Sequence, residues 1–166
     1  MNPPIMPQRN YDAVIAALSP AGDRQQRMRT CVDALWAELS HKGVSWVGFY
    51  LKNPDVDELV LGPRRDKPAC SPISMHGACG RAFQSKKPLV VTDVNNLRAG
   101  YIACDPRDRS EIVIPCMDAY DDMAWGVLDL DSYDTNAFAE RDAVGLSNVL
   151  VHMGLHVPQA GLVEVV

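Results

Sequence analysis

Apolar residues recur at the helical period in two segments of this chain. Over residues 23–41 they form a single stripe made by Met28, Cys31, Val32, Leu35, Trp36 and Leu39. One apolar stripe at this spacing predicts an amphipathic helix. Residues 139–155 carry a similar stripe and predict a second long helix. A shorter helix is expected over residues 11–18, before Ser19-Pro20, because the residue that precedes a proline disfavours helical backbone.

Between the two long helices the pattern changes to the short apolar and alternating runs that are typical of β-strands. Six strands are predicted, over residues 44–51, 58–62, 69–74, 89–93, 111–119 and 123–132. Tight turns such as Asn53-Pro54-Asp55 join neighbouring strands and favour antiparallel pairing. A short helix is expected over residues 76–86, a long functional loop over residues 95–109, and a frayed tail after residue 156.

This order of elements predicts an α+β domain in which helices cover one face of an antiparallel sheet. A length of 166 residues predicts a single domain that buries about two-thirds of its unfolded surface. We divide the chain into an N-terminal arm with a short helix (residues 1–20), the domain itself (residues 21–156) and a C-terminal tail (residues 157–166).

Composition and charge exclude several classes of function. With a formal net charge of −5 and no basic run, the chain is expected to bind neither nucleic acid nor an anionic membrane. Its apolar stretches are far shorter than the ~20 residues of a membrane-spanning helix, and its first residues lack the apolar core of a signal peptide. We expect a cytoplasmic protein whose five cysteines are thiols rather than a structural disulfide framework.

Carboxylates on two strands are the first candidate chemistry. Alternation along residues 123–132 puts Asp129 and Asp131 on one face of the strand and Leu128 and Leu130 on the other. If the preceding strand turns Glu111 to the same side, three carboxylates converge. The alternative is that Asp129 and Asp131 only end a strand and enter a turn, since charged side chains are mostly exposed.

Three of the cysteines lie in contexts that favour reactivity. Cys79 is expected at a helix N-terminus, where the pKa of a thiol is lowered. Cys104 lies in the long loop and Cys70 near the start of a strand. Cys31 falls on the helical stripe, and Cys116 is by default a small core residue. No Cys-x-x-Cys pair occurs, and His152 and His156, four residues apart near a helix end, are interpreted as part of a solvated face, so no metal or cofactor is predicted.

A series of short motifs resembles one known family. They are Trp46-Val-Gly-Phe-Tyr50, Ala69-Cys70, Gly77-Ala-Cys-Gly80, Ile102-Ala-Cys-Asp105, Ser110-Glu-Ile-Val-Ile-Pro115 and Gly126-Val-Leu-Asp-Leu-Asp-Ser132. Together they resemble the GAF-domain free methionine-(R)-sulfoxide reductases. The resemblance implies a GAF-like fold: a central six-stranded antiparallel sheet, with the N- and C-terminal helices packed on one face and a ligand pocket on the other.

The same resemblance implies an activity and assigns roles to residues. Cys104 is the expected nucleophile that reduces free L-methionine-(R)-sulfoxide, and Cys70 the thiol that resolves its sulfenic acid, with Cys79 as an auxiliary or alternative partner. Glu111, Asp129 and Asp131 are expected to bind the substrate, and the rings of Trp46 and Tyr50 either wall its methyl-thioether end or only pack the core. A thioredoxin-like reductant and a homodimer are implied as partners. The rival interpretation is a non-catalytic sensory GAF domain that binds a small ligand.

Overall fold

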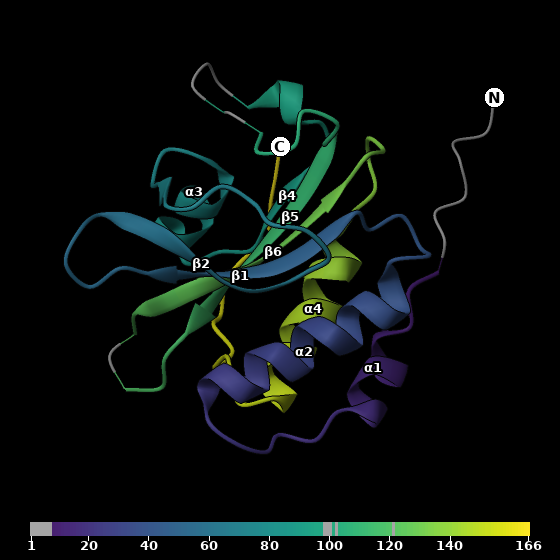
Figure 1. Cartoon of the computed structure of the whole chain (residues 1–166), viewed down its shortest axis with the longest axis vertical. Coiled ribbons are helices and arrows are strands. Elements are labelled where there is room, and N and C mark those ends of the chain that lie inside the picture. Colours follow the sequence, from purple (N-terminus) through teal and green to yellow (C-terminus); the bar gives the residue numbers. More distant parts are fainter. Residues whose placement is uncertain (1–7, 98–100, 102, 121) are drawn as a thin grey trace.

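A single sheet organises the fold, which we describe from a computed structural model covering residues 8–97, 101, 103–120 and 122–166 (Figure 1). In this part of the chain the sheet has seven strands in the order β3-β2-β1-β6-β5-β4-β7. The strands are β1 (Trp46–Lys52), β2 (Glu58–Arg65), β3 (Ile73–Ser74), β4 (Leu89–Val91), β5 (Ser110–Met117), β6 (Ala124–Ser132) and β7 (Glu164–Val165). The helices are α1 (Tyr11–Ala17), α2 (Arg24–Leu39), α3 (Ala78–Ser85) and α4 (Glu140–His152), with a 3-10 turn, η1 (Val94–Asn96).

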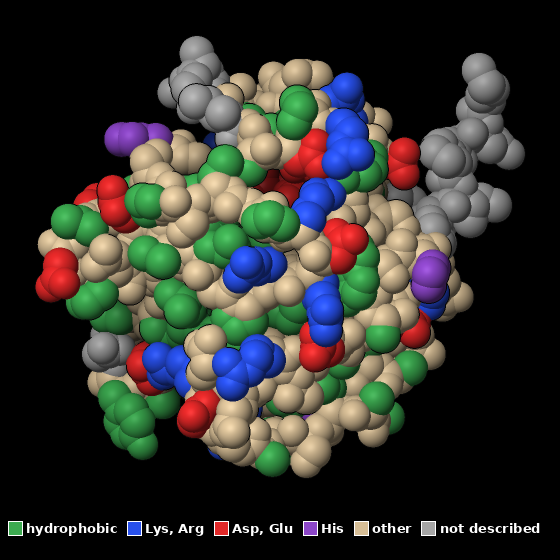
Figure 2. Space-filling view, in the orientation of Figure 1, with side chains coloured by type: hydrophobic (Ala, Val, Ile, Leu, Met, Phe, Trp, Pro, Cys, Tyr) green, Lys and Arg blue, Asp and Glu red, His purple; other side chains and the backbone are tan. Residues whose placement is uncertain are grey.

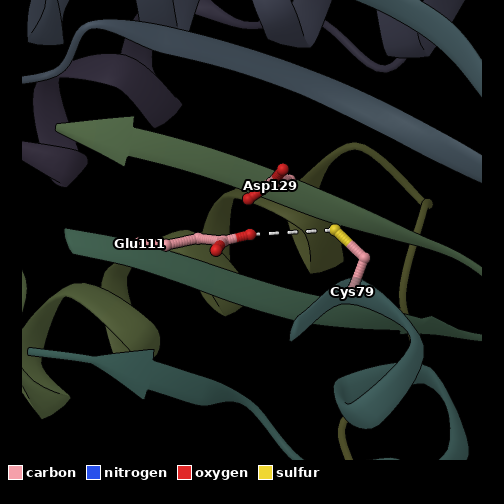
Figure 3. Close-up of side chains that lie close together, drawn as sticks. All are labelled: Cys79, Glu111 and Asp129. Atoms are coloured by element: carbon pink, nitrogen blue, oxygen red, sulfur yellow. Dashed lines mark hydrogen bonds between the residues drawn. The ribbon is translucent and has the colours of Figure 1, made fainter. Parts of the chain in front are cut away.

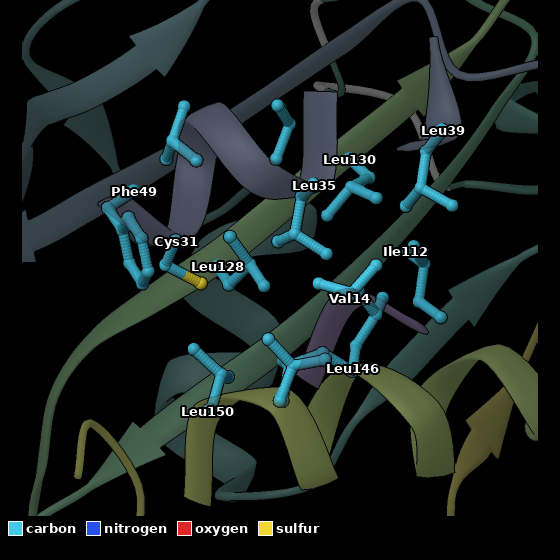
Figure 4. Close-up of a cluster of buried hydrophobic side chains, with 14 of the residues drawn as sticks. Val14, Cys31, Leu35, Leu39, Phe49, Ile112, Leu128, Leu130, Leu146 and Leu150 are labelled. Atoms are coloured by element: carbon cyan, nitrogen blue, oxygen red, sulfur yellow. The ribbon is translucent and has the colours of Figure 1, made fainter. Parts of the chain in front are cut away.

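The helices α1, α2 and α4 cover one face of the sheet (Figure 1). The predicted stripe of α2 faces the sheet, and the helix begins at a capping box in which Asp23 and Gln26 each bond the other's backbone N–H. Leu35, Phe49 and Leu146 meet there in a core of buried apolar side chains (Figure 4). This core, which we call the helical-side core, removes apolar area from water, which is the dominant favourable contribution to the free energy of folding.

The opposite face of the sheet carries α3 and the loops that follow β2 and β4 (Figure 1). Its apolar cluster is smaller and includes Trp46, Tyr50, Cys79 and Val113. Strand β6 contributes to both sides: Leu128 and Leu130 belong to the helical-side core, whereas Val127 belongs to the second cluster. The alternation predicted for this strand is therefore confirmed over residues 127–130, whereas Trp125, expected on the same face as Val127, packs instead against the helical-side core.

The α+β class and the helices on one face of an antiparallel sheet are confirmed, but the sheet is one strand wider than predicted. The tail that was expected to fray ends in a strand, because β7 pairs in parallel with β4. Backbone bonds link Val166 N to Val90 O at 2.9 Å and Thr92 N to Val166 O at 2.7 Å. This pairing satisfies the N–H and C=O groups that the edge strand β4 would otherwise leave unpaired.

Two further predictions need correction or restriction. The strand expected over residues 69–74 is reduced to β3, and residues 69–72 belong to no strand. Pro72 has no N–H group to donate to a strand ladder, which limits how far the strand extends. The loop expected over residues 95–109 begins with the end of η1. Its other described residues form neither helix nor strand, and residues 98–100 and 102 lie outside the described part of the chain. Within the described residues, none of the helices combines the length and the apolar character needed to cross a bilayer.

Candidate active site

A cavity of about 290 Å³ lies on the face of the sheet that carries α3. Strands β1, β5 and β6 form its floor, α3 one wall, and the loops around Cys70 and Cys104 its rim. It is lined by Trp46, Tyr50, Ala69, Cys70, Ile73, Ser74, Gly77, Ala78, Cys79, Tyr101, Cys104, Asp108, Glu111, Asp129 and Asp131. All eight residues singled out from the sequence are in this set, so the structure brings them to one place.

The register of the central strands makes the three carboxyl groups converge. Glu111 of β5 lies directly opposite Asp131 of β6, and Val113 lies opposite Asp129. Residues directly opposite each other in an antiparallel pair point to the same face of the sheet. The condition on which the sequence argument depended is therefore met, and the alternative that these acids merely end a strand does not hold.

Burial perturbs all three carboxyl groups. Glu111 and Asp129 are only 4% and 5% exposed, and burial raises the pKa of Glu111 above its ordinary range. Burial, with the repulsion of Asp131 and Glu111, raises the pKa of Asp129, and burial with Glu111 and Asp108 raises that of Asp131. Asp129 Oδ1 has no hydrogen-bond partner among the described residues. Burial and the crowding of like charges both disfavour the ionised form of a carboxyl group, so each group holds its proton to a higher pH than an exposed carboxyl group does.

Cys79 lies at the start of α3 with its thiol against these acids (Figure 3). Its Sγ donates to Glu111 Oε1 at 3.9 Å. The sequence predicted a lowered pKa from the helix N-terminus, and this is wrong: burial, together with Asp129 and Glu111, raises the pKa of Cys79 well above its ordinary value. Burial, followed by repulsion from the carboxyls, outweighs the helix dipole, so this thiol favours its protonated form and is a poor nucleophile.

Cys70 and Cys104 form a disulfide at the rim of the cavity, with their Cα atoms 5.6 Å apart. Both residues are exposed, whereas the three remaining cysteines are buried. Cys31 and Cys116 lie in the helical-side core, as predicted for them. The exposed disulfide is thus the one cysteine pair among the described residues that a reductant in solution can reach directly.

Trp46 and Tyr50 line the cavity and at the same time hold its rim in place. Their rings lie 6.1 Å apart between centroids, on the side of β1 that faces the carboxyls. Trp46 Nε1 donates to Lys67 O at 2.9 Å, and Tyr50 OH donates to Cys70 O at 2.8 Å. Gly48 lies between them, and a Cβ there would collide with the Trp46 ring. The two rings therefore wall the cavity and anchor the loop that carries Cys70.

Side chains beside the two exposed cysteines also bridge their loops. Lys67 Nζ lies 3.2 Å from Asp105 Oδ2, and Tyr133 OH donates to the same oxygen at 3.0 Å. Two hydrogen bonds from the Arg107 side chain hold the pKa of Asp105 well below its ordinary range. On the face shown in Figure 2, Lys and Arg side chains lie next to Asp and Glu rather than in a separate basic area.

The sequence argument missed two titratable residues of the cavity, both in the loop before β5. Tyr101 OH donates to Glu111 Oε2 at 3.0 Å. Asp108 is 5% exposed, and burial with the repulsion of Asp105 and Glu111 raises its pKa to about 7. Because this loop has no periodicity, nothing in its sequence distinguishes the inward side chains from the outward ones.

Comparison with known proteins agrees with this geometry. The GAF domain family profile matches residues 23–155. The structure of free methionine-R-sulfoxide reductase from Neisseria meningitidis is 32% identical, with a TM-score of 0.76 over 86% of this chain and 83% of that one. The chain belongs to the GAF-domain family of free methionine-R-sulfoxide reductases.

Other members of the family are equally similar to this GAF domain. The reduced form of the Staphylococcus aureus protein is 31% identical, with a TM-score of 0.79, and the match covers 90% of this chain and 96% of that one. The Saccharomyces cerevisiae free methionine-R-sulfoxide reductase is 39% identical over 60% of this chain and 55% of its own length. The chain spans about three fifths of the length of four curated relatives that it matches.

Proposed function

We propose that this protein reduces free L-methionine-(R)-sulfoxide to L-methionine, using Cys104 as the nucleophile. The observation that carries the proposal is the position of an exposed cysteine pair at the rim of a cavity whose floor holds three carboxyl groups, of which Glu111 and Asp129 are buried. A thiol pair supplies two electrons, and carboxyl groups supply a binding site for an ammonium group and a proton for a leaving oxygen. Family membership supports the same assignment.

In the first step, the Cys104 thiolate attacks the sulfoxide sulfur. The oxygen is transferred to Cys104 as a sulfenic acid, and methionine leaves; the substrate sulfur is reduced and the cysteine oxidised by the same two electrons. In the second step, the Cys70 thiol attacks the sulfenic sulfur, which closes the disulfide and releases the oxygen as water. We assign this resolving role to Cys70 rather than Cys79, because the Cys79 thiol is buried and its pKa is raised.

The carboxyl groups have two tasks in this proposal. At least one of Glu111, Asp129 and Asp131 ionises to bind the substrate ammonium, and a second keeps its proton and donates it to the sulfoxide oxygen. Burial and mutual repulsion raise the pKa of each group, which favours such a mixed protonation state near neutral pH. Trp46 and Tyr50 provide the apolar wall for the methyl-thioether end.

Recycling needs a dithiol reductant that can reach the rim. Both Cys70 and Cys104 are exposed, which supports exchange with a thioredoxin-like protein. We place the reaction in the cytoplasm and expect a homodimer. A sensory GAF domain that only binds a ligand would leave this exposed disulfide without a role, so we favour the enzyme.

A substrate panel tests the proposal. With dithiothreitol as reductant, we expect turnover of free L-methionine-(R)-sulfoxide, and at least tenfold slower turnover of the S epimer and of the N-acetylated R sulfoxide. Chirality fixes where the oxygen points relative to the fixed acids, and acetylation removes the ammonium charge. Equal rates for the free and the N-acetylated sulfoxide would show that the carboxyl groups do not select a free amino acid. An absence of methionine from every sulfoxide would favour the sensory alternative.

A further inference from the structure

Three potential metal ligands meet at the floor of the cavity. The Sγ of Cys79 and one carboxylate oxygen each of Glu111 and Asp129 all lie within 4.8 Å of one another (Figure 3). They come from three elements, α3, β5 and β6, and each residue is no more than 5% exposed. A soft thiolate with two carboxylates is a donor set suited to a tetrahedral d¹⁰ cation such as Zn²⁺.

A second observation points to a ligand at the same place. Asp129 lines the cavity, and its buried Oδ1 has no hydrogen-bond partner among the described residues. Buried polar atoms are nearly always paired, because an unpaired one costs about 1–3 kcal/mol. A bound cation would give this oxygen the partner it lacks.

We propose that Cys79, Glu111 and Asp129 form a binding site for a thiophilic divalent cation, Zn²⁺ or Cd²⁺, at the floor of the cavity. Zn–S bonds of ~2.3 Å and Zn–O bonds of ~2.0 Å at the tetrahedral angle put sulfur and oxygen ~3.5 Å apart. The observed distance from Cys79 Sγ to Glu111 Oε1 is 3.9 Å, so a shift of a few tenths of an ångström completes this edge. The cavity leaves the fourth position open to water or to Asp131.

A thiol and carboxyl groups must lose their protons to bind a cation, so binding at this cluster releases protons. The other titratable groups around the cluster are Asp131 on the same strand as Asp129, Tyr50 on β1, and Tyr101 and Asp108 in the loop before β5. Affinity therefore rises with pH. The cation also occupies the carboxyl groups to which we assign the substrate ammonium, so it competes with substrate.

The oxidised protein is the right sample for the test, because its Cys70–Cys104 disulfide removes the two exposed thiols from competition. Titration with Cd²⁺, followed by the ultraviolet sulfur-to-cadmium charge-transfer band, should saturate at one Cd²⁺ per chain, and Zn²⁺ should displace it. Cys79→Ser should abolish the band, and Glu111→Gln should weaken Cd²⁺ binding at least tenfold. Cys31→Ala and Cys116→Ala are matched controls that should keep it, because both thiols lie in the helical-side core.

Absence of the band in wild type, or its persistence in a folded Cys79→Ser variant, would overturn the proposal. If Cys79→Ser does not fold, Glu111→Gln is the variant that tests the site. Unchanged Cd²⁺ affinity in Glu111→Gln would also refute the proposal. The measurement involves no turnover. Its failure is therefore distinguishable from a failure of the proposed reductase activity, which the substrate panel tests separately.

Discussion

Replacing Asp129 by asparagine separates a catalytic role of the carboxyl cluster from a structural one. The amide has nearly the same shape, so the variant loses only the ionisable proton of a side chain that is 5% exposed. Removing a positioned general acid typically costs ~10²–10⁴ in rate. Because Glu111 and Asp131 remain in the same cavity, we expect Asp129→Asn to lose about 10²-fold in kcat/KM, which is about 2.7 kcal/mol of barrier.

Stability should change in the opposite direction. The folded-state pKa of Asp129 is raised above its unfolded value, so folded and unfolded states are both protonated at low pH. As the pH rises past about 4, the unfolded chain ionises first and wild type loses stability until the folded pKa is passed. Each pH unit in that window costs about 1.4 kcal/mol for this proton. Asp129→Asn lacks this contribution and should be more stable than wild type at pH 8, with little difference at pH 4.

The assay combines initial rates, measured with dithiothreitol as reductant, with urea unfolding at pH 4 and pH 8, measured on protein in which the Cys70–Cys104 disulfide is formed. Asp134→Asn is the matched control: Asp134 lies just beyond β6 with an exposed side chain, and only its backbone bonds Ser110 and Ser132. The control should keep wild-type kinetics. Wild-type rates in Asp129→Asn, or a variant that is less stable than wild type at pH 8, would refute the role we give to the buried carboxyl group.

Two other predictions concern the cysteine pair. Cys104→Ser should form no methionine, whereas Cys70→Ser should form about one methionine per chain and then stop, because the chemistry needs one thiol and regeneration needs two. Single-turnover quantification of methionine measures both outcomes. Methionine formation by Cys104→Ser would show that the nucleophile is misassigned. Lys67→Met should slow disulfide closure about fivefold while leaving methionine formation unchanged, because the Lys67–Asp105 pair that bridges the two cysteine loops is worth roughly 1 kcal/mol. Rapid mixing followed by thiol quenching measures the rate of disulfide closure, with Lys87→Met, at an exposed lysine, as the control variant. An unchanged rate in Lys67→Met would mean that the Lys67–Asp105 pair does not position the loops.

The elements that the sequence predicted well are those whose contacts repeat along the chain. The stripe of α2 and the alternation of β6 each encode which face is buried, because every third or fourth residue, or every second one, meets the same layer. Strand β7 carries no such signal. Its two residues are fixed by pairing with β4, which lies more than seventy positions earlier in the sequence.

In the candidate active site, too, periodic segments were predicted correctly and aperiodic segments were not. Alternation along the strand was enough to place Asp129 and Asp131 on one side of β6. Glu111 joins them once the register between β5 and β6 is known, because it lies directly opposite Asp131. Tyr101 and Asp108 could not be predicted from the sequence, because an aperiodic loop does not encode which side chains point into the cavity. The pKa of Cys79 was predicted in the wrong direction for a related reason. The helix N-terminus is visible in the sequence, but the burial of the thiol and the carboxyls on β5 and β6, which together outweigh it, depend on the tertiary fold.

The two faces of the sheet explain how the fold tolerates its own active site. Burying Glu111 and Asp129 with raised pKa values and an unpaired oxygen is unfavourable, and a small domain has little stability to spare. On β6 the side chains of Leu128 and Leu130 enter the helical-side core, while the alternate positions, Asp129 and Asp131, face the cavity. Because stabilising and reactive side chains occupy opposite faces of the same strand, the core offsets the cost of the carboxyls without contacting them. Conservative substitutions on the cavity face should therefore change reactivity while the fold persists.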